Sequence, residues 1–99
     1  MRRPDDPTLD RALGTTVVVE GRVRSVGRSG GRTYLNFGDD FRRDFAVVLD
    51  DNLRVALTAA GIDPDRVRGR ELRVRGVLVL REGLRIEPAS PDEVEWVRR

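Results

Sequence analysis

Alternating apolar and polar residues dominate the chain from residue 15 onward and predict a mainly β structure. In the segment 15–27, Val17, Val19 and Val23 share one face, and charged side chains occupy the other. This period of two is typical of a half-buried strand. Gly21 interrupts the pattern, and a long strand with a glycine or bulge is how a small sheet coils into a barrel.

Four further segments with the same character follow, separated by glycine, proline and aspartate. They are 32–37, 44–50, 71–80 and 84–88. The one helical pattern covers 51–60, with Leu53, Leu57 and Ala60 on one side, an aspartate available as N-cap and Gly61 as its stop. Residues 90–93 fit a capping box, whereas residues 93–97 alternate like a strand. We favour a turn followed by a short terminal strand.

The order of these elements is three strands, a helix and two strands. It predicts a five-stranded Greek-key barrel, the OB-fold, with one helix between strands 3 and 4. A generic α+β sheet is the alternative. Ninety-nine residues allow one core. We therefore expect an N-terminal tail over 1–14, loose at first and with one helical turn, and a single OB-fold domain over 15–99.

The amino-acid composition excludes several classes of catalytic and metal-binding site. The chain has no cysteine or histidine, and all 19 basic residues are arginine. Zinc sites of the usual type, serine–histidine triads, Walker lysines and Schiff bases are thereby excluded. We expect a protein that is not an enzyme and uses no cofactor or metal. The net charge is only +2, so a basic surface would need arginines gathered on one side.

The hydropathy of the chain predicts no membrane-spanning segment. The longest apolar run is four residues, Val77 to Leu80, far too short to cross a bilayer. Met1 leads directly into charged residues and prolines, without the apolar stretch of a signal peptide. We expect a cytoplasmic location, or a periplasmic or secreted one if a leader preceded this sequence.

Several short motifs carry a family resemblance over about residues 15–97. "EGRVRSV", "TYLNFGDDF", "DFAVVL", "VRGRELRVRGVL" and "GLRIEPASPDEVEWV" resemble stand-alone bacterial OB-fold domains of the nucleic-acid-binding, anticodon-binding-like type. The resemblance implies binding of single-stranded DNA or RNA. In OB-folds the usual groove lies on strands two and three and on the loops joining strands one–two and four–five.

Tyr34 and Asn36 are the first candidates for that groove. If Leu35 and Phe37 point into the core, Tyr34 and Asn36 point outward on the second strand. Tyr34 would then stack on a base while Asn36 contacts a base edge. The alternative is that Tyr34 packs against a loop and only adds cross-strand stability.

Arginines from three segments are predicted to converge on the same rim, where they would contact phosphates. They are Arg28, Arg32, Arg42, Arg43, Arg81 and Arg85. Acidic residues are interleaved with them, so the alternative is a set of weak surface ion pairs.

A second basic set lies on the first and fourth strands, where Glu20 and Glu71 are placed to relieve the repulsion. Its members are Arg22, Arg24, Arg73 and Arg75. A solvated face is the favoured interpretation. The aspartate pairs at 39–40 and 50–51 suit turns and helix caps better than a metal. Trp96 is predicted to close one end of the barrel.

Two functions therefore compete. The first is a non-catalytic module that binds single-stranded nucleic acid with little sequence preference. The second is a protein-interaction or accessory barrel, which would dock a protein partner or a second copy through an outer face that exposes Ala46 and Val48. Salt-dependent binding of an oligonucleotide distinguishes the two.

Overall fold

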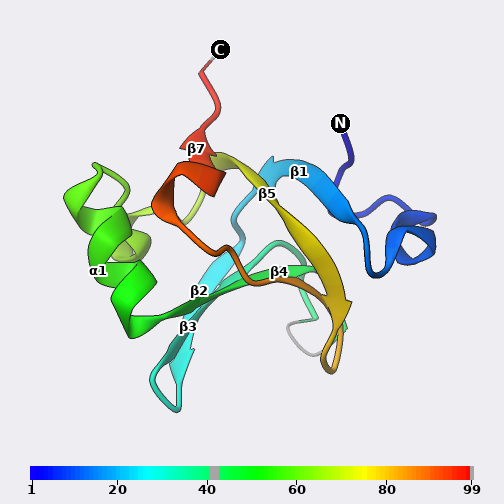
Figure 1. Ribbon diagram of the computed structural model, residues 1–99, viewed down its shortest axis with the longest axis horizontal. Coiled ribbons are helices and arrows are strands. Elements are labelled where there is room, and N and C mark those ends of the chain that lie inside the picture. Colours follow the sequence, from blue (N-terminus) through cyan, green and yellow to red (C-terminus); the bar gives the residue numbers. More distant parts are fainter. Residues whose placement is uncertain (41–42, 99) are drawn as a thin grey trace.

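The computed structural model describes residues 1–40 and 43–98 and is mainly β, with seven strands and one α-helix (Figure 1). The strands are β1 (Thr16–Arg22), β2 (Ser25–Ser29), β3 (Arg32–Asn36), β4 (Ala46–Asp50), β5 (Glu71–Leu80), β6 (Leu84–Ile86) and β7 (Val94–Trp96). The helices are α1 (Asp51–Ala59) and the short 3-10 turns η1 (Leu9–Ala12), η2 (Pro64–Arg66) and η3 (Pro91–Glu93). No helix within these residues has the length and apolar character needed to cross a membrane.

The strands form one sheet in the order β1-β5-β6-β4-β3-β2, and β7 pairs with β5. All pairs are antiparallel except β4 with β6. The predicted first strand is two strands, because the backbone changes partners at Val23 and Arg24. Val23 N donates to Arg70 O (2.9 Å), whereas Arg24 N donates to Asn36 O (2.7 Å). The predicted short terminal strand is confirmed as β7.

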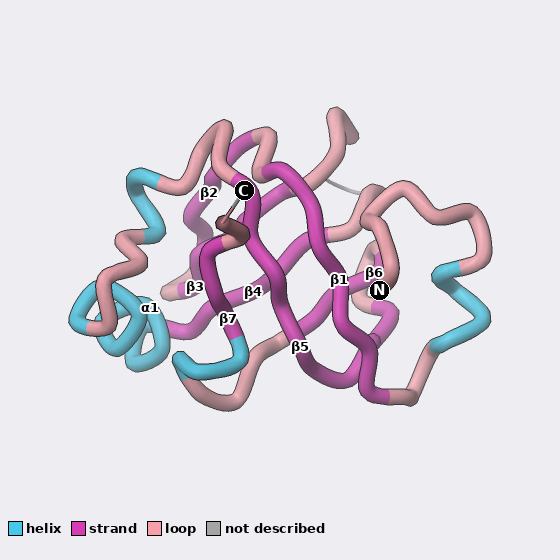
Figure 2. Tube along the Cα trace, turned by 90° about the horizontal axis from the view of Figure 1, so that it is seen from above, coloured by secondary structure: helices cyan, strands magenta, loops and turns pink. Residues whose placement is uncertain are grey.

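Helical segments lie at the two ends of the molecule, with the strands between them (Figure 2). Figure 2 places α1 at one end and η1 at the other, with β5 between β1 and β7. Asp50 Oδ1 accepts from Leu53 N (2.7 Å), which confirms aspartate as the cap of α1. Leu53 and Leu57 are buried as predicted, but Ala60 is exposed because it is the C-cap, beyond the last helical turn.

The core is aliphatic and lies between the inner faces of the strands and α1. Its most completely buried side chains include Leu35, Leu49, Leu57, Leu72, Leu78 and Ile86. Phe37 and Phe45 add a tilted ring pair with centroids 5.4 Å apart. The alternation that placed Leu35 and Phe37 in the core is therefore confirmed. Gly30 and Gly31 have φ of 58° and 77° and form the β2–β3 turn.

The N-terminal segment is bound to the sheet, so the expectation of a loose beginning is wrong. Arg2 N donates to Val18 O (3.0 Å) and Glu20 N donates to Arg2 O (2.9 Å), which places the segment along β1. Leu9 is fully buried in the core. Hydrogen bonds from Thr8 and the Arg2 guanidinium lower the pKa of Asp6 to about 2, so the Asp6 carboxylate is ionised at neutral pH.

Candidate nucleic-acid interface

The outward face of β2, β3 and β4 consists of rows of paired residues that run across the strands. Tyr34 is central and half-buried, and it lies opposite Gly27 of β2 and Val48 of β4. Gly27 has no side chain, and a Cβ built at this position would meet no atom within 4 Å. One side of the Tyr34 ring therefore borders open space instead of a neighbouring side chain.

The next row toward the β6 end contains Asn36, Ser25, Ala46 and Arg85. Asn36 lies opposite Ser25 and Ala46, and Ala46 is in register with Arg85. Asn36 is 7% exposed, and its Nδ2 donates to Ser25 Oγ (3.2 Å). The predicted outward direction of Asn36 is confirmed, although most of its surface is covered.

Two hollows lie on either side of Tyr34 and share its side chain. The central hollow, of about 420 Å³, is lined by Ser25, Val26, Gly27, Arg28, Ser29, Tyr34, Asn36, Glu82 and Arg85. The turn-side hollow, of about 220 Å³, is lined by Arg32, Tyr34, Val48, Arg81, Glu82, Arg85 and Glu87. Together they form an open groove, with Tyr34 at its middle and arginines along both halves.

The predicted arginine rim is brought together in part. Arg28, Arg32, Arg81 and Arg85 line the two hollows. Arg43 is exposed but lines neither of them, and Arg42 lies outside the described residues. Strand alternation puts Arg28 on the opposite face of β2 from Gly27, so Arg28 reaches the central hollow around the open edge of β2.

Arg85 is buried under the groove, which the sequence pattern did not predict. It is 3% exposed, and its Nη1 donates to Asp44 O (2.7 Å) and Leu84 O (3.1 Å). Burial lowers the pKa of Arg85, and the nearby Glu82 and Tyr34 partly oppose that shift. A guanidinium does not deprotonate in proteins, so Arg85 supplies a fixed positive charge beneath the groove floor.

Ala46 and Val48 share the outer face with Asn36 and Tyr34, as predicted, but the exposure that would favour docking of a protein partner is not found. Ala46 is 0% exposed and Val48 is 7% exposed. The register explains this, because Tyr34 lies beside Val48 and Arg85 beside Ala46, and both neighbours have large side chains. The outer face therefore offers no apolar floor for a protein partner at these two residues.

Acidic side chains partly neutralise the positive charge of the groove. Arg28 pairs with Asp65 (Nη2 to Oδ1, 2.6 Å) and Arg81 with Glu87 (Nε to Oε2, 3.4 Å). Both pairs are largely exposed, so each contributes little to stability and can exchange for another anion. In the described part of the chain, Arg32 has no ion-pair partner. The alternative of surface ion pairs therefore describes Arg28 and Arg81, whereas Arg32 stays a predicted phosphate contact.

The second basic set is largely neutralised, and the ion pairs of Arg22 and Arg73 lie on β1, β5 and β7, away from the groove. Arg73 pairs with Glu20 (Nη2 to Oε2, 3.2 Å) and Glu95 (Nη1 to Oε1, 3.0 Å), and Arg22 pairs with Glu71 (Nη2 to Oε1, 3.5 Å). The predicted relief by Glu20 and Glu71 is thus confirmed. Trp96 packs partly against the core, and its indole N–H donates to Gly61 O (3.3 Å).

Sequence reasoning missed Gly27, Ser25 and Glu82 as parts of the site. Gly27 ends the strand-like segment 15–27 in the sequence, and only its register with Tyr34 shows that it borders the space beside that side chain. Glu82 lines both hollows from the β5–β6 turn, with a φ of 68°. The tight turn was predictable from Gly83, but the direction of the Glu82 side chain was not.

Comparison with known proteins gives structural neighbours only. No family model matches the chain, and no curated protein matches it. The OBody AM1L10, solved bound to hen egg-white lysozyme, superimposes with a TM-score of 0.63 at 22% identity, over 90% of this chain and 85% of that one. The S. pombe Stn1–Ten1 complex matches with a TM-score of 0.62 at 15% identity, over 85% of this chain and 59% of that one.

A third neighbour is asparaginyl-tRNA synthetase from Pyrococcus horikoshii. It has a TM-score of 0.64 at 18% identity, and the match covers 89% of this chain but 21% of the synthetase. All three likenesses are below 25% identity and show the fold alone. That fold is the OB-fold.

Proposed function

We propose that the protein is a non-catalytic OB-fold module that binds single-stranded nucleic acid with little sequence preference. The observation that carries this proposal is the position of Tyr34, half-exposed between two hollows whose walls carry arginines. An aromatic platform beside separate points of positive charge is what a single strand needs for its bases and its phosphates.

Stacking on Tyr34 supplies the contact to a base. The space above Gly27 is open, and Gly27 and Tyr34 line the same hollow, so a base would approach Tyr34 from the β2 side. Base–aromatic stacking is worth roughly 1–3 kcal/mol per base and tolerates every base. A single platform therefore predicts modest affinity and weak sequence preference. Asn36, held against Ser25, adds a polar group at one end of the platform.

Phosphate contacts fall to Arg32, Arg81 and Arg28. These three line the hollows from β3, the β5–β6 turn and β2. The buried Arg85 adds positive charge beneath these three arginines without contacting a phosphate itself. Because Arg28 and Arg81 exchange an exposed carboxylate for a phosphate, the net gain of each contact is smaller than for an unpaired arginine.

The competing function, docking of a protein partner, has one supporting observation: the OBody neighbour is described as bound to lysozyme. The synthetase neighbour carries tRNA in its name, which supports the nucleic-acid proposal equally indirectly. The burial of Ala46 and Val48 supports the nucleic-acid proposal, since it removes the apolar floor on which docking at this face relied.

We also propose that the sheet closes as a five-stranded Greek-key barrel, with α1 between its third and fourth strands. β1 and β2 would then be the two halves of one bent first strand. The support is that only Val23 and Arg24 separate them, while they occupy opposite ends of the strand order. In such a barrel the groove lies across one wall, with its two hollows supported by a rigid frame.

The test of the function is the salt dependence of binding to a labelled mixed-sequence single strand of 20 nucleotides. With contacts from Arg28, Arg32 and Arg81, we expect log Kobs to fall with log[salt] at a slope of about −2, or roughly −0.7 per phosphate. Fluorescence anisotropy at several salt concentrations measures it. Duplex DNA of the same sequence is the control, and we expect it to bind more weakly. Binding that ignores salt, or no binding at low salt, would contradict the proposal.

A further inference from the structure

A third hollow continues the groove around the open edge of β2. It measures about 400 Å³ and is lined by Ser25, Val26, Arg28, Asp65 and Arg68. The central hollow shares Ser25, Val26 and Arg28 with it, just as it shares Tyr34, Glu82 and Arg85 with the turn-side hollow. The three hollows therefore adjoin in one series from the β5–β6 turn, past Tyr34, to the connector between α1 and β5.

Arg68 gives this connector hollow an available positive charge. Its side chain is exposed, and no acidic group among residues 1–40 and 43–98 is close enough to form an ion pair with it. The connector is well fixed, because Gly69 N donates to Val23 O (2.8 Å) and Arg70 N to Val67 O (2.9 Å). Arg68 thus projects from a fixed backbone beside β2.

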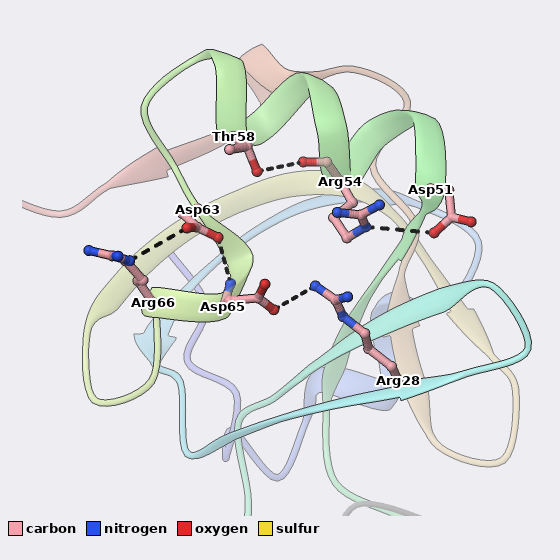
Figure 3. Close-up of polar contacts among 7 residues, drawn as sticks. All are labelled: Arg28, Asp51, Arg54, Thr58, Asp63, Asp65 and Arg66. Carbon is pink, nitrogen blue, oxygen red and sulfur yellow. Dashed lines mark hydrogen bonds and ion pairs between the residues drawn. The ribbon is translucent and has the colours of Figure 1, made fainter.

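Arg28 and Asp65 meet across this hollow (Figure 3). Figure 3 shows Arg28 extending from β2 toward Asp65 on η2, while Arg66 of the same turn points away from Arg28. The Nη2–Oδ1 distance is 2.6 Å, and the two side chains are 49% and 60% exposed. The cap of η2 is Asp63, whose Oδ1 accepts from Asp65 N (2.9 Å). The Asp65 carboxylate is therefore not the cap, and we expect η2 to persist without the ion pair.

We propose that the nucleic-acid track extends over the edge of β2 to a second, phosphate-binding subsite at Arg28 and Arg68, which the Arg28–Asp65 ion pair occupies in the free protein. This rests on the proposed function of the Tyr34 groove. A phosphate entering the connector hollow takes the place of the Asp65 carboxylate on Arg28 and gains Arg68 as a second cation. Asp65 also repels the strand, so it limits affinity for long ligands.

Ligand length distinguishes this subsite from the Tyr34 groove. A strand of four thymidines can cover Tyr34 and its adjacent hollows, whereas a strand of ten also reaches Arg68, within the site sizes of about 4–16 nucleotides known for OB-folds. Both oligonucleotides are measured by anisotropy against the wild type, Arg68→Ala and Asp65→Asn. Arg66→Ala is the control, since Arg66 is another exposed arginine two residues away, which pairs with Asp63 and points away from Arg28.

For the ten-nucleotide strand, we expect Arg68→Ala to weaken binding about threefold to tenfold, the loss of one charged contact, and to lower the salt slope by about 0.7. Asp65→Asn should tighten binding of the same strand. Arg68→Ala should not affect the four-nucleotide strand, whereas Asp65→Asn also frees Arg28 for the central hollow and should tighten binding of that strand as well. Arg66→Ala should affect neither strand. If both strands bind but Arg68→Ala and Asp65→Asn match the wild type, the subsite is overturned and the groove stands. If neither strand binds the wild type, the proposed function itself fails.

Discussion

Replacing Tyr34 by alanine is expected to lower the affinity for single strands by roughly 5-fold to 150-fold, the equivalent of one stacked base at about 1–3 kcal/mol. Tyr34 is the only tyrosine of the chain, and it separates the central hollow from the turn-side hollow. Alanine removes the platform while leaving the arginines in place. The salt slope should therefore change little even as the affinity falls. Anisotropy titrations at two salt concentrations measure both quantities.

Tyr34→Phe is the control for this change, because phenylalanine keeps the ring and loses only the hydroxyl. We expect it to bind close to the wild type. Cross-strand contact with Val48 gives Tyr34 a structural role as well, worth about 0.2–1 kcal/mol, so thermal unfolding of each variant is recorded beside binding. A Tyr34→Ala protein that melts earlier yet binds as well as the wild type would show that the residue only stabilises the sheet.

Introducing valine at Gly27 should abolish most of the binding without weakening the fold. A Cβ at this position meets no atom within 4 Å, and valine suits a strand better than glycine. We therefore expect the melting temperature to stay the same or rise. The valine methyl groups would occupy the space beside Tyr34 that a base needs, so the expected loss of affinity is comparable to that of Tyr34→Ala.

A graded series strengthens this second test. Gly27→Ala fills less of the space and should lose less affinity, and Thr16→Val on β1 adds a valine to an exposed strand position away from the groove. Thr16→Val should leave binding unchanged. Full affinity in Gly27→Val would mean that bases do not approach Tyr34 from the β2 side. The direction of approach derived from the Gly27–Tyr34 register would then be wrong.

Strand alternation predicted the directions of the side chains at the site correctly, because these directions depend only on the local sequence. Leu35 and Phe37 point inward and Tyr34 and Asn36 outward because a strand alternates its side chains, whatever its partners. The short terminal strand β7 was also accessible to this reasoning. So was the N-cap of α1, because an aspartate before an apolar helical pattern has a defined local role.

Features that depend on pairing between distant segments could not be predicted in the same way. Arg85 looks like a rim residue in sequence, but the parallel pairing of β4 with β6 places it beside Ala46 and under the groove. Its burial is also why Ala46 is covered. The openness beside Tyr34 depends on the register that sets Gly27 opposite it. Arg68 enters the track only because the connector before β5 is held against Val23.

The binding of the N-terminal segment is a further example of such dependence. Its charges and prolines predict disorder, whereas Leu9 finds a place in the core and Arg2 pairs with the edge of β1. Gly21 allows this contact, since a Cβ at that position would clash with the Pro4 ring. No local pattern reveals that a glycine in one strand accommodates a proline 17 positions earlier.

Amide chemical-shift mapping with a short thymidine strand tests the central claim most directly. The account predicts that the largest shifts on titration fall on Gly27, Tyr34 and Asn36, and on Arg81 and Glu82 of the β5–β6 turn. Amides of β5 and β7 outside the groove, such as those of Arg73 and Trp96, should stay unchanged. Saturable shifts confined to that region, or no shifts at millimolar ligand, would contradict the assignment of this groove to nucleic acid.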